Sequence, residues 1–156
     1  MAAQNLNRSR LRNQGLRFEP RQVMQVNNPR VLYIEDHEDT RELVTLLLGQ
    51  KSFDVITGST IESGLALATA QRFDLYLLDS WLPDGSGLEL CQRIREFDQT
   101  TPILFYSAAA YASDHASALE CGAQAYLIKP SQPSELCRMV SELIEASRQP
   151  VRQTAH

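Results

Sequence analysis

Five short apolar runs recur between residues 31 and 128, and each is followed by a stretch whose apolar residues have helical spacing. The runs occupy residues 31–34, 53–57, 75–78, 102–106 and 125–128. Short runs that are apolar throughout are typical of parallel strands buried on both faces. Because crossovers between parallel strands are right-handed, the pattern predicts an α/β fold: a (βα)₅ doubly wound parallel sheet with helices on both faces.

The helices between these runs are predicted at residues 38–50, 61–71, 88–97 and 114–121, and from about 131–133 to a stop at Pro150. The apolar spacing also predicts which side chains of the first and third helices face the sheet. We expect inward positions at Leu43, Val44, Leu47 and Leu48, and at Leu90, Cys91, Ile94 and Phe97.

Charge is divided unevenly along the chain. Residues 1–30 contain six arginines and one acid, for a net +5, whereas the remainder carries −9. Residues 1–29 lack sustained periodicity and end in Asn27-Asn28-Pro29, which favours a flexible basic arm. We expect one domain at 30–148 after this arm and a short tail at 149–156. Because the remainder of the chain is acidic, the protein is not a uniformly basic nucleic-acid binder, and any contact with nucleic acid would involve the arm. The other interpretation of the arm is a solvated leader.

The sequence predicts a cytoplasmic protein without membrane contact. No apolar run approaches the roughly 20 residues that span a bilayer, and no signal-peptide hydrophobic segment is present. The chain has three cysteines, Cys91, Cys121 and Cys137. Their odd number does not suit a framework of disulfide pairs, and they form no Cys-x-x-Cys motif. Three such cysteines are typical of reduced thiols packed in a core.

Polar residues stand directly after four of the five apolar runs. Glu35 and Asp36 follow the first run, Asp79 the third, Ser107 the fourth, and Lys129 the fifth. In an open parallel sheet, ligands bind beyond the carboxyl ends of the strands. Taken singly, each residue is more often a helix cap, a turn residue or a surface charge. Jointly they predict three carboxylates, a hydroxyl and an ammonium at one edge of the sheet.

This combination suits metal-assisted phosphoryl chemistry. Two carboxylates about 4 Å apart repel by roughly 4 kcal/mol at an effective dielectric near 20, so three of them demand a compensating cation. Mg²⁺ prefers oxygen ligands and keeps waters that phosphate oxygens can replace. A carboxylate beside Mg²⁺, a lysine and a hydroxyl is a plausible phosphoryl acceptor, and Asp79 is the candidate.

Residues 31 to about 148 resemble the receiver domain of two-component response regulators. The resemblance rests on four segments, in order and suitably spaced: 31–36 (VLYIED), 77–87 (LLDSWLPDGSG), 102–108 (PILFYSA) and 122–130 (GAQAYLIKP). It implies a flavodoxin-like sheet of order 2-1-3-4-5. It also implies that Asp79 receives a phosphoryl group from a phosphohistidine of a sensor histidine kinase or a histidine phosphotransfer protein.

The resemblance further implies a role for each site residue. Asp36 and Asp79 would bind Mg²⁺ through their side chains, the backbone carbonyl of Trp81 would be the third protein ligand, and Glu35 would act through a metal-bound water. Lys129 would pair with the phosphoryl group, and the Lys129–Pro130 bond would be cis.

The family's switch pair would be Ser107 and Tyr126. Ser107 would move toward the new phosphoryl oxygen, and Tyr126 would rotate into the vacated space. The chain departs from the commonest family pattern in two places: its acidic pair is Glu-Asp rather than Asp-Asp, and Ser replaces Thr at position 107. Both changes keep the chemistry that phosphorylation needs.

The preferred interpretation is a stand-alone response regulator rather than an enzyme. Only residues 149–156 follow the last predicted helix, which is too short for an effector domain. Its downstream protein target would therefore bind the face formed by the fourth helix, the fifth strand and the fifth helix. A phosphorelay intermediate is an equally allowed variant.

Three alternatives rank lower. A constitutive interaction module that has lost phosphorylation would not need the intact Asp36, Asp79, Ser107 and Lys129. An aspartyl phosphohydrolase of the haloacid-dehalogenase type would need a second Asp at position 81, where Trp81 stands. A flavin or nucleotide binder would need a glycine-rich loop after the first strand.

Overall fold

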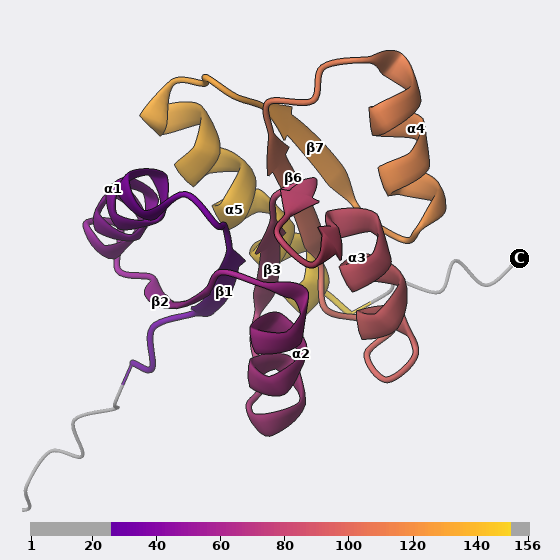
Figure 1. Ribbon diagram of the computed structural model, residues 1–156. Coiled ribbons are helices and arrows are strands. Elements are labelled where there is room, and N and C mark those ends of the chain that lie inside the picture. Colours follow the sequence, from indigo (N-terminus) through magenta and orange to yellow (C-terminus); the bar gives the residue numbers. More distant parts are fainter. Residues whose placement is uncertain (1–25, 151–156) are drawn as a thin grey trace, which may run out of the picture.

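A five-stranded parallel sheet organises the computed structural model of the protein, which describes residues 26–150 (Figure 1). Its strand order is β2-β1-β3-β6-β7, and a separate two-stranded antiparallel ribbon is formed by β4 and β5. The strands are β1 (Arg30–Ile34), β2 (Asp54–Gly58), β3 (Leu75–Leu78), β4 (Trp81–Leu82), β5 (Gly85–Ser86), β6 (Ile103–Ser107) and β7 (Ala125–Ile128). Counted over the large sheet alone, this is the predicted order 2-1-3-4-5, and the predicted fold class is confirmed.

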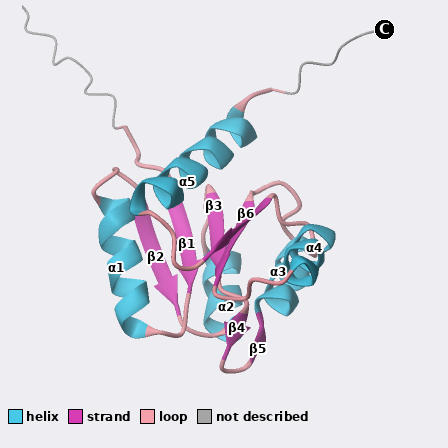
Figure 2. Cartoon of the chain, turned by 90° about the horizontal axis from the view of Figure 1, so that it is seen from above, coloured by secondary structure: helices cyan, strands magenta, loops and turns pink. Residues whose placement is uncertain are grey.

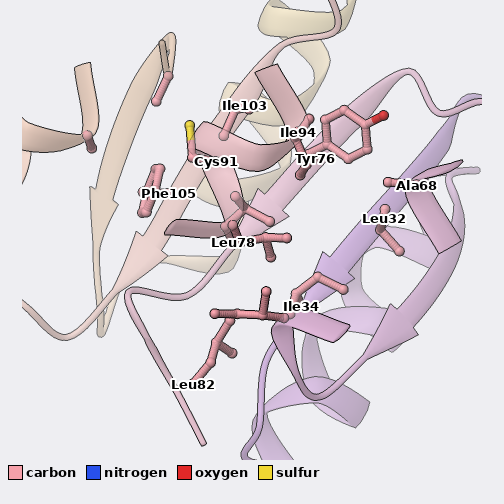
Figure 3. Packing of buried hydrophobic residues seen from close by; sticks show 14 of the residues in the cluster. Leu32, Ile34, Ala68, Tyr76, Leu78, Leu82, Cys91, Ile94, Ile103 and Phe105 are labelled. Atoms are coloured by element: carbon pink, nitrogen blue, oxygen red, sulfur yellow. The ribbon is translucent and has the colours of Figure 1, made fainter. Parts of the chain in front are cut away.

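Helices cover both faces of the sheet (Figure 2). They are α1 (Glu38–Gly49), α2 (Ile61–Ala70), α3 (Gly87–Arg95), α4 (Ala112–Glu120) and α5 (Pro133–Arg148). Side chains that alternate along each strand form two separate cores, as the period of two in a strand requires. Leu32, Ile34 and Phe105 lie in the core under α2, α3 and α4 (Figure 3), whereas Val31 and Tyr33 lie in the core under α1 and α5.

Two predicted inward positions are wrong. Leu43 is 56% exposed, because Val44 and Leu48 one turn apart supply the buried stripe of α1. Phe97 is 47% exposed, because α3 ends at Arg95 and Phe97 lies beyond the helical periodicity. The remaining predicted positions of α3 are buried: Leu90, Cys91 and Ile94.

Element boundaries differ from the predictions by one or two residues. Strands β2 and β6 each begin and end one residue later than predicted, and α4 begins at Ala112 rather than Asp114. The side chain of Asp114 accepts a hydrogen bond from the backbone N–H of Tyr111 at 3.0 Å, so Asp114 closes the first turn from inside the helix. The β4–β5 ribbon lies between the third predicted strand and the third predicted helix, where no strand was predicted.

The predicted basic arm, residues 1–29, lies outside the described residues except for 26–29, and of the predicted tail only 149 and 150 are described. All three cysteines are free thiols, with Cys91 and Cys137 buried and Cys121 half-buried. No helix within residues 26–150 has the length and apolar character needed to cross a bilayer.

Backbone hydrogen bonds between neighbouring strands continue past the strand ends. The N–H of Asp79 donates to the carbonyl of Ile34 at 3.0 Å, and the N–H of Lys129 donates to the carbonyl of Ser107 at 2.8 Å. These bonds extend the sheet register by one residue into the polar segment. The sheet itself therefore positions the candidate site.

Candidate functional site

Three carboxylates meet at the carboxyl ends of β1 and β3. Glu35, Asp36 and Asp79 each offer an oxygen, and these oxygens all lie within 4.8 Å of one another. Glu35 is 1% exposed and Asp79 is 8% exposed, whereas Asp36 is open to solvent. The predicted convergence of these acids is thus present in the structure.

Hydrogen bonds and an ion pair hold the Glu35 carboxylate in place. Its Oε1 accepts the backbone N–H of His37 at 3.0 Å, and its Oε2 accepts the Tyr33 hydroxyl at 3.2 Å and also contacts the Lys129 ammonium. Burial acts to raise the pKa of Glu35, but the hydrogen bond from Lys129 and the other donors outweigh it and hold that pKa below its usual value. Glu35 is therefore an anion whose two oxygens are already engaged by the protein.

Asp79 has the opposite balance. Burial raises the pKa of Asp79 above its usual value, and the negative charge of Glu35 adds to the effect against the opposing charge of Lys129. Its Oδ1 accepts the backbone N–H of Ser80 at 2.7 Å, and its Oδ2 lies 3.9 Å from the Lys129 ammonium. The protein therefore compensates the charge of Asp79 less fully than that of Glu35.

Lys129 spans the site from β7, at the far edge of the sheet. Its ammonium contacts Glu35, reaches Asp79 at 3.9 Å, and lies 5.1 Å from the centre of the Tyr106 ring. The Lys129–Pro130 peptide bond is cis, as predicted. One ammonium therefore serves two carboxylates, which leaves the cluster with excess negative charge.

Ser107 and Tyr126 lie beside this cluster on the other side of Asp79. Ser107 is fully buried at the end of β6, and its hydroxyl acts to lower the pKa of Asp79. Tyr126 is half-buried on β7, and its hydroxyl donates to the backbone carbonyl of Ala109 at 2.7 Å. The loop that follows β6 thus connects the two predicted switch residues, because the N–H of Ala109 also donates to Ser107 Oγ at 3.1 Å.

Trp81 is 67% exposed at the start of the β4–β5 ribbon. Its ring makes no part of the acidic cluster, so only its backbone carbonyl could fill the ligand position that the resemblance assigns to this residue. Asp84, in the turn between β4 and β5, contacts the start of α2 rather than the acidic cluster. Its carboxylate accepts hydrogen bonds from the N–H groups of Ile61 at 2.8 Å and Glu62 at 3.1 Å.

Sequence reasoning missed four residues that support the site. Tyr33 and Arg41 brace Glu35, the first through its hydroxyl and the second through a hydrogen bond from Nη1 to the Glu35 carbonyl at 2.7 Å. Ser80 contacts both Asp79 and Tyr126, and Gly87 packs against the Asp79 backbone. Only Tyr33 had a signal in the sequence, because residues two apart on a strand face the same side.

The donor set fits a divalent cation that prefers oxygen. Within residues 26–150, Asp36 and Asp79 retain carboxylate oxygens without a hydrogen-bond donor, and Asp36 is open to solvent. Soft ligands are absent from the cluster, since it contains neither His nor Cys. Excess negative charge and hard oxygen atoms suit Mg²⁺.

A comparison with known families identifies the family to which this fold belongs. The sequence profile of the response regulator receiver domain matches residues 31–141. The chain belongs to the response regulator receiver domain family. The four segments that first suggested the family all lie within the matched residues.

Curated relatives are response regulators as well. The receiver is 34% identical over 121 residues to the response regulator ArlR of Staphylococcus saprophyticus, covering 78% of this chain and 54% of that protein. It is 33% identical over 120 residues to the alkaline phosphatase synthesis transcriptional regulatory protein PhoP of Bacillus subtilis, covering 77% and 50%. The chain therefore spans about half the length of the curated relatives it matches.

Solved receiver structures share the fold over their whole length. The HemR receiver domain from Leptospira biflexa, in its non-phosphorylated form, superposes with a TM-score of 0.74 at 32% identity, covering 79% of this chain and 99% of that one. A receiver domain protein from Methanospirillum hungatei gives a TM-score of 0.74 at 25% identity, covering 77% and 96%. The chain is thus a receiver domain consistent with two-component signalling.

Proposed function

We propose that this receiver accepts a phosphoryl group on Asp79 from the phosphohistidine of a sensor histidine kinase or a histidine phosphotransfer protein. The observation that supports this most directly is the position of Asp79 in the cluster. Its carboxylate lies among Glu35, Asp36 and Lys129, next to the fully buried Ser107 hydroxyl.

The transfer needs positioning and charge neutralisation more than covalent chemistry by other side chains. An Asp79 carboxylate oxygen forms the new bond to phosphorus, the phosphorus–nitrogen bond of the phosphohistidine breaks, and its electron pair returns to the imidazole. Lys129, 3.9 Å from Asp79 Oδ2, neutralises the phosphoryl oxygens. Ser107 donates its hydroxyl to one of them.

Asp36, Asp79 and the backbone carbonyl of Trp81 would hold Mg²⁺, with Glu35 acting through a bound water. The engaged oxygens of Glu35 support this indirect role, because both already accept hydrogen bonds from the protein. Bound Mg²⁺ supplies positive charge against the developing charge on the phosphoryl group. The protein is then a stoichiometric acceptor rather than an enzyme.

The output of the receiver would be a protein contact on the face formed by α4, β7 and α5. Three large apolar side chains are exposed on or beside this face: Tyr111 at 79%, Leu119 at 45% and Ile128 at 46%. Phosphorylation would bias an existing equilibrium of this face, for which several kcal/mol of preference are needed if the switch is to be decisive. The same chemistry at Asp79 would also suit a phosphorelay intermediate in the cytoplasm.

Intact-mass measurement after incubation with acetyl phosphate and Mg²⁺ tests the proposal. We expect a gain of one phosphoryl group that is lost in Asp79→Asn and on removal of Mg²⁺ by EDTA. Asp39→Asn is the matched control, because Asp39 is an exposed acid on α1 outside the cluster, and it should still gain the group. No gain in the wild-type protein would instead favour a constitutive interaction module. Transfer onward to a histidine phosphotransfer domain would identify a relay.

A further inference from the structure

A hydroxyl group next to the acceptor residue contacts the hydroxyl of Tyr126. The Oγ atom of Ser80 lies 3.3 Å from the Tyr126 hydroxyl oxygen. Tyr126 has one hydroxyl proton, and the shorter bond to the Ala109 carbonyl, at 2.7 Å, uses it. The Ser80 hydroxyl is therefore the donor, and Tyr126 accepts.

This contact is part of a chain of hydrogen bonds that runs from Asp79 to Ser107. The backbone N–H of Ser80 donates to Asp79 at 2.7 Å, and Ser80 Oγ donates to Tyr126. Tyr126 donates to Ala109, whose N–H donates to Ser107 at 3.1 Å. Ser107, at the end of this chain, acts to lower the pKa of Asp79. Hydrogen bonds thus connect Asp79 to Tyr126 through Ser80 alone, whereas the bonds through Ala109 end at Ser107.

The ring of Tyr126 packs between two aromatic neighbours. It stacks with Phe105 of β6 at a centroid distance of 5.9 Å and an interplanar angle of 3°, and with His115 of α4 at 5.5 Å and 25°. Stacking of flat faces permits sliding, whereas the two hydrogen bonds to the hydroxyl fix the end of the side chain. Loss of either bond therefore changes where the hydroxyl lies.

We propose that Ser80 is a positioning residue that transmits changes at Asp79 to Tyr126. The proposal rests on the function proposed above, in which Asp79 accepts a phosphoryl group. Phosphorylation changes the charge of the carboxyl that holds the Ser80 N–H, so the Ser80 backbone must adjust. Because the Ser80 side chain is bonded to Tyr126, the adjustment reaches the tyrosine without passing through Ser107.

Fluorine NMR of the full chain, labelled with 3-fluorotyrosine, tests this route. The protein has five tyrosines, and the resonance that disappears in Tyr126→Phe belongs to Tyr126. Before phosphorylation, Ser80→Ala should shift or broaden that resonance, and Ser80→Thr, which keeps the hydroxyl, should restore it. Ser113→Ala is the matched control, because Ser113 is exposed on α4 and lies outside this chain of hydrogen bonds.

The second measurement adds acetyl phosphate and Mg²⁺ to the same labelled proteins. We expect the displacement of the Tyr126 resonance in Ser80→Ala to be no more than half of the wild-type displacement, while intact mass shows equal phosphorylation. A Tyr126 resonance in Ser80→Ala that matches the wild type in the first measurement would overturn the proposal. So would an equal displacement in the second.

Failure of the proposed function gives a different result. In that case intact mass shows no phosphoryl gain in wild type, and no donor-dependent displacement appears in any variant. The first measurement still decides whether Ser80 positions Tyr126, because it needs no phosphoryl group.

Discussion

A Cβ atom placed on Gly87 would lie 2.0 Å from the backbone carbonyl oxygen of Asp79. Gly87 is the first residue of α3, and its N–H donates to the Ser80 carbonyl at 2.9 Å. The helix start is therefore packed directly onto the backbone of the proposed acceptor. Only a residue without a side chain allows this approach.

Gly87→Ala should displace the acceptor segment or the start of α3. The clash is with backbone rather than with a flexible side chain, so we expect a loss of about 1–3 kcal/mol in the free energy of unfolding, the usual cost of overpacking. Phosphorylation of Asp79 by acetyl phosphate should slow as well. Urea unfolding and intact mass measure the two effects.

Gly49→Ala is the matched control for this variant. A Cβ at Gly49 would meet nothing within 4 Å, and Gly49 is the last residue of α1. Alanine there should be neutral or stabilising by up to about 1 kcal/mol, because it restricts the unfolded chain. Equal stability of the two alanine variants would contradict the close packing of Gly87 on Asp79.

Asp84→Ala should destabilise α2 from a distance in the sequence. The Asp84 carboxylate accepts the N–H groups of Ile61 and Glu62, and the bond from Ile61 is the main cause that holds the pKa of Asp84 below its usual value. Loss of a helix cap costs about 1 kcal/mol in the free energy of unfolding, which urea titration measures. Asp84→Asn keeps an acceptor and should lose less; a loss as large as that of the alanine variant would argue against capping.

The sheet and the residues at its edge were predictable because both depend on local pattern and simple topology. Short apolar runs indicate buried parallel strands, and parallel strands bring Glu35, Asp79 and Lys129 to one edge whatever the loops do. Small shifts of the boundaries of β2 and β6 did not matter, because each site residue still follows its strand or ends it.

Contacts that depend on loop conformation could not be predicted in this way. Nothing in the sequence indicates that Asp84 caps a helix that begins 23 residues earlier, or that Ser80 Oγ reaches Tyr126. The exposure of Leu43 and Phe97 was missed for a related reason: apolar character shows which residues can be buried, whereas the exact ends and rotation of a helix decide which are.

Removal of the Lys129 charge should leave Glu35 as a buried, uncompensated anion. Lys129→Met keeps most of the side-chain length but loses the ion pair with a residue that is 1% exposed. Removing one partner of a buried ion pair costs about 3–5 kcal/mol in the free energy of unfolding. We expect a loss near the lower end of this range, because the Lys129 side chain is 18% exposed. Urea unfolding in EDTA buffer measures the loss.

Glu35→Gln combined with Lys129→Met supplies the control for this pair. Because glutamine carries no charge, the double variant should recover part of the stability that the single Lys129→Met variant loses. Additive losses in this double-mutant cycle would show that the two side chains do not interact in solution.

The receiver should lose stability as the pH falls below about 4, because the carboxylate of Asp98 becomes protonated. Burial acts to raise the pKa of Asp98, but donors from Thr101, Thr100 and Tyr76 outweigh it and hold that pKa below its usual value. A carboxyl with a lowered folded-state pKa contributes stability above its unfolded pKa of about 3.9, and this contribution is lost as the pH falls through the folded-state pKa.

Between pH 5 and pH 3, the free energy of unfolding should therefore decrease less in Asp98→Asn than in the wild type. Tyr76→Phe removes one donor, at 2.9 Å, and should give an intermediate decrease. Parallel curves of unfolding free energy against pH for the wild type and Asp98→Asn would contradict this assignment.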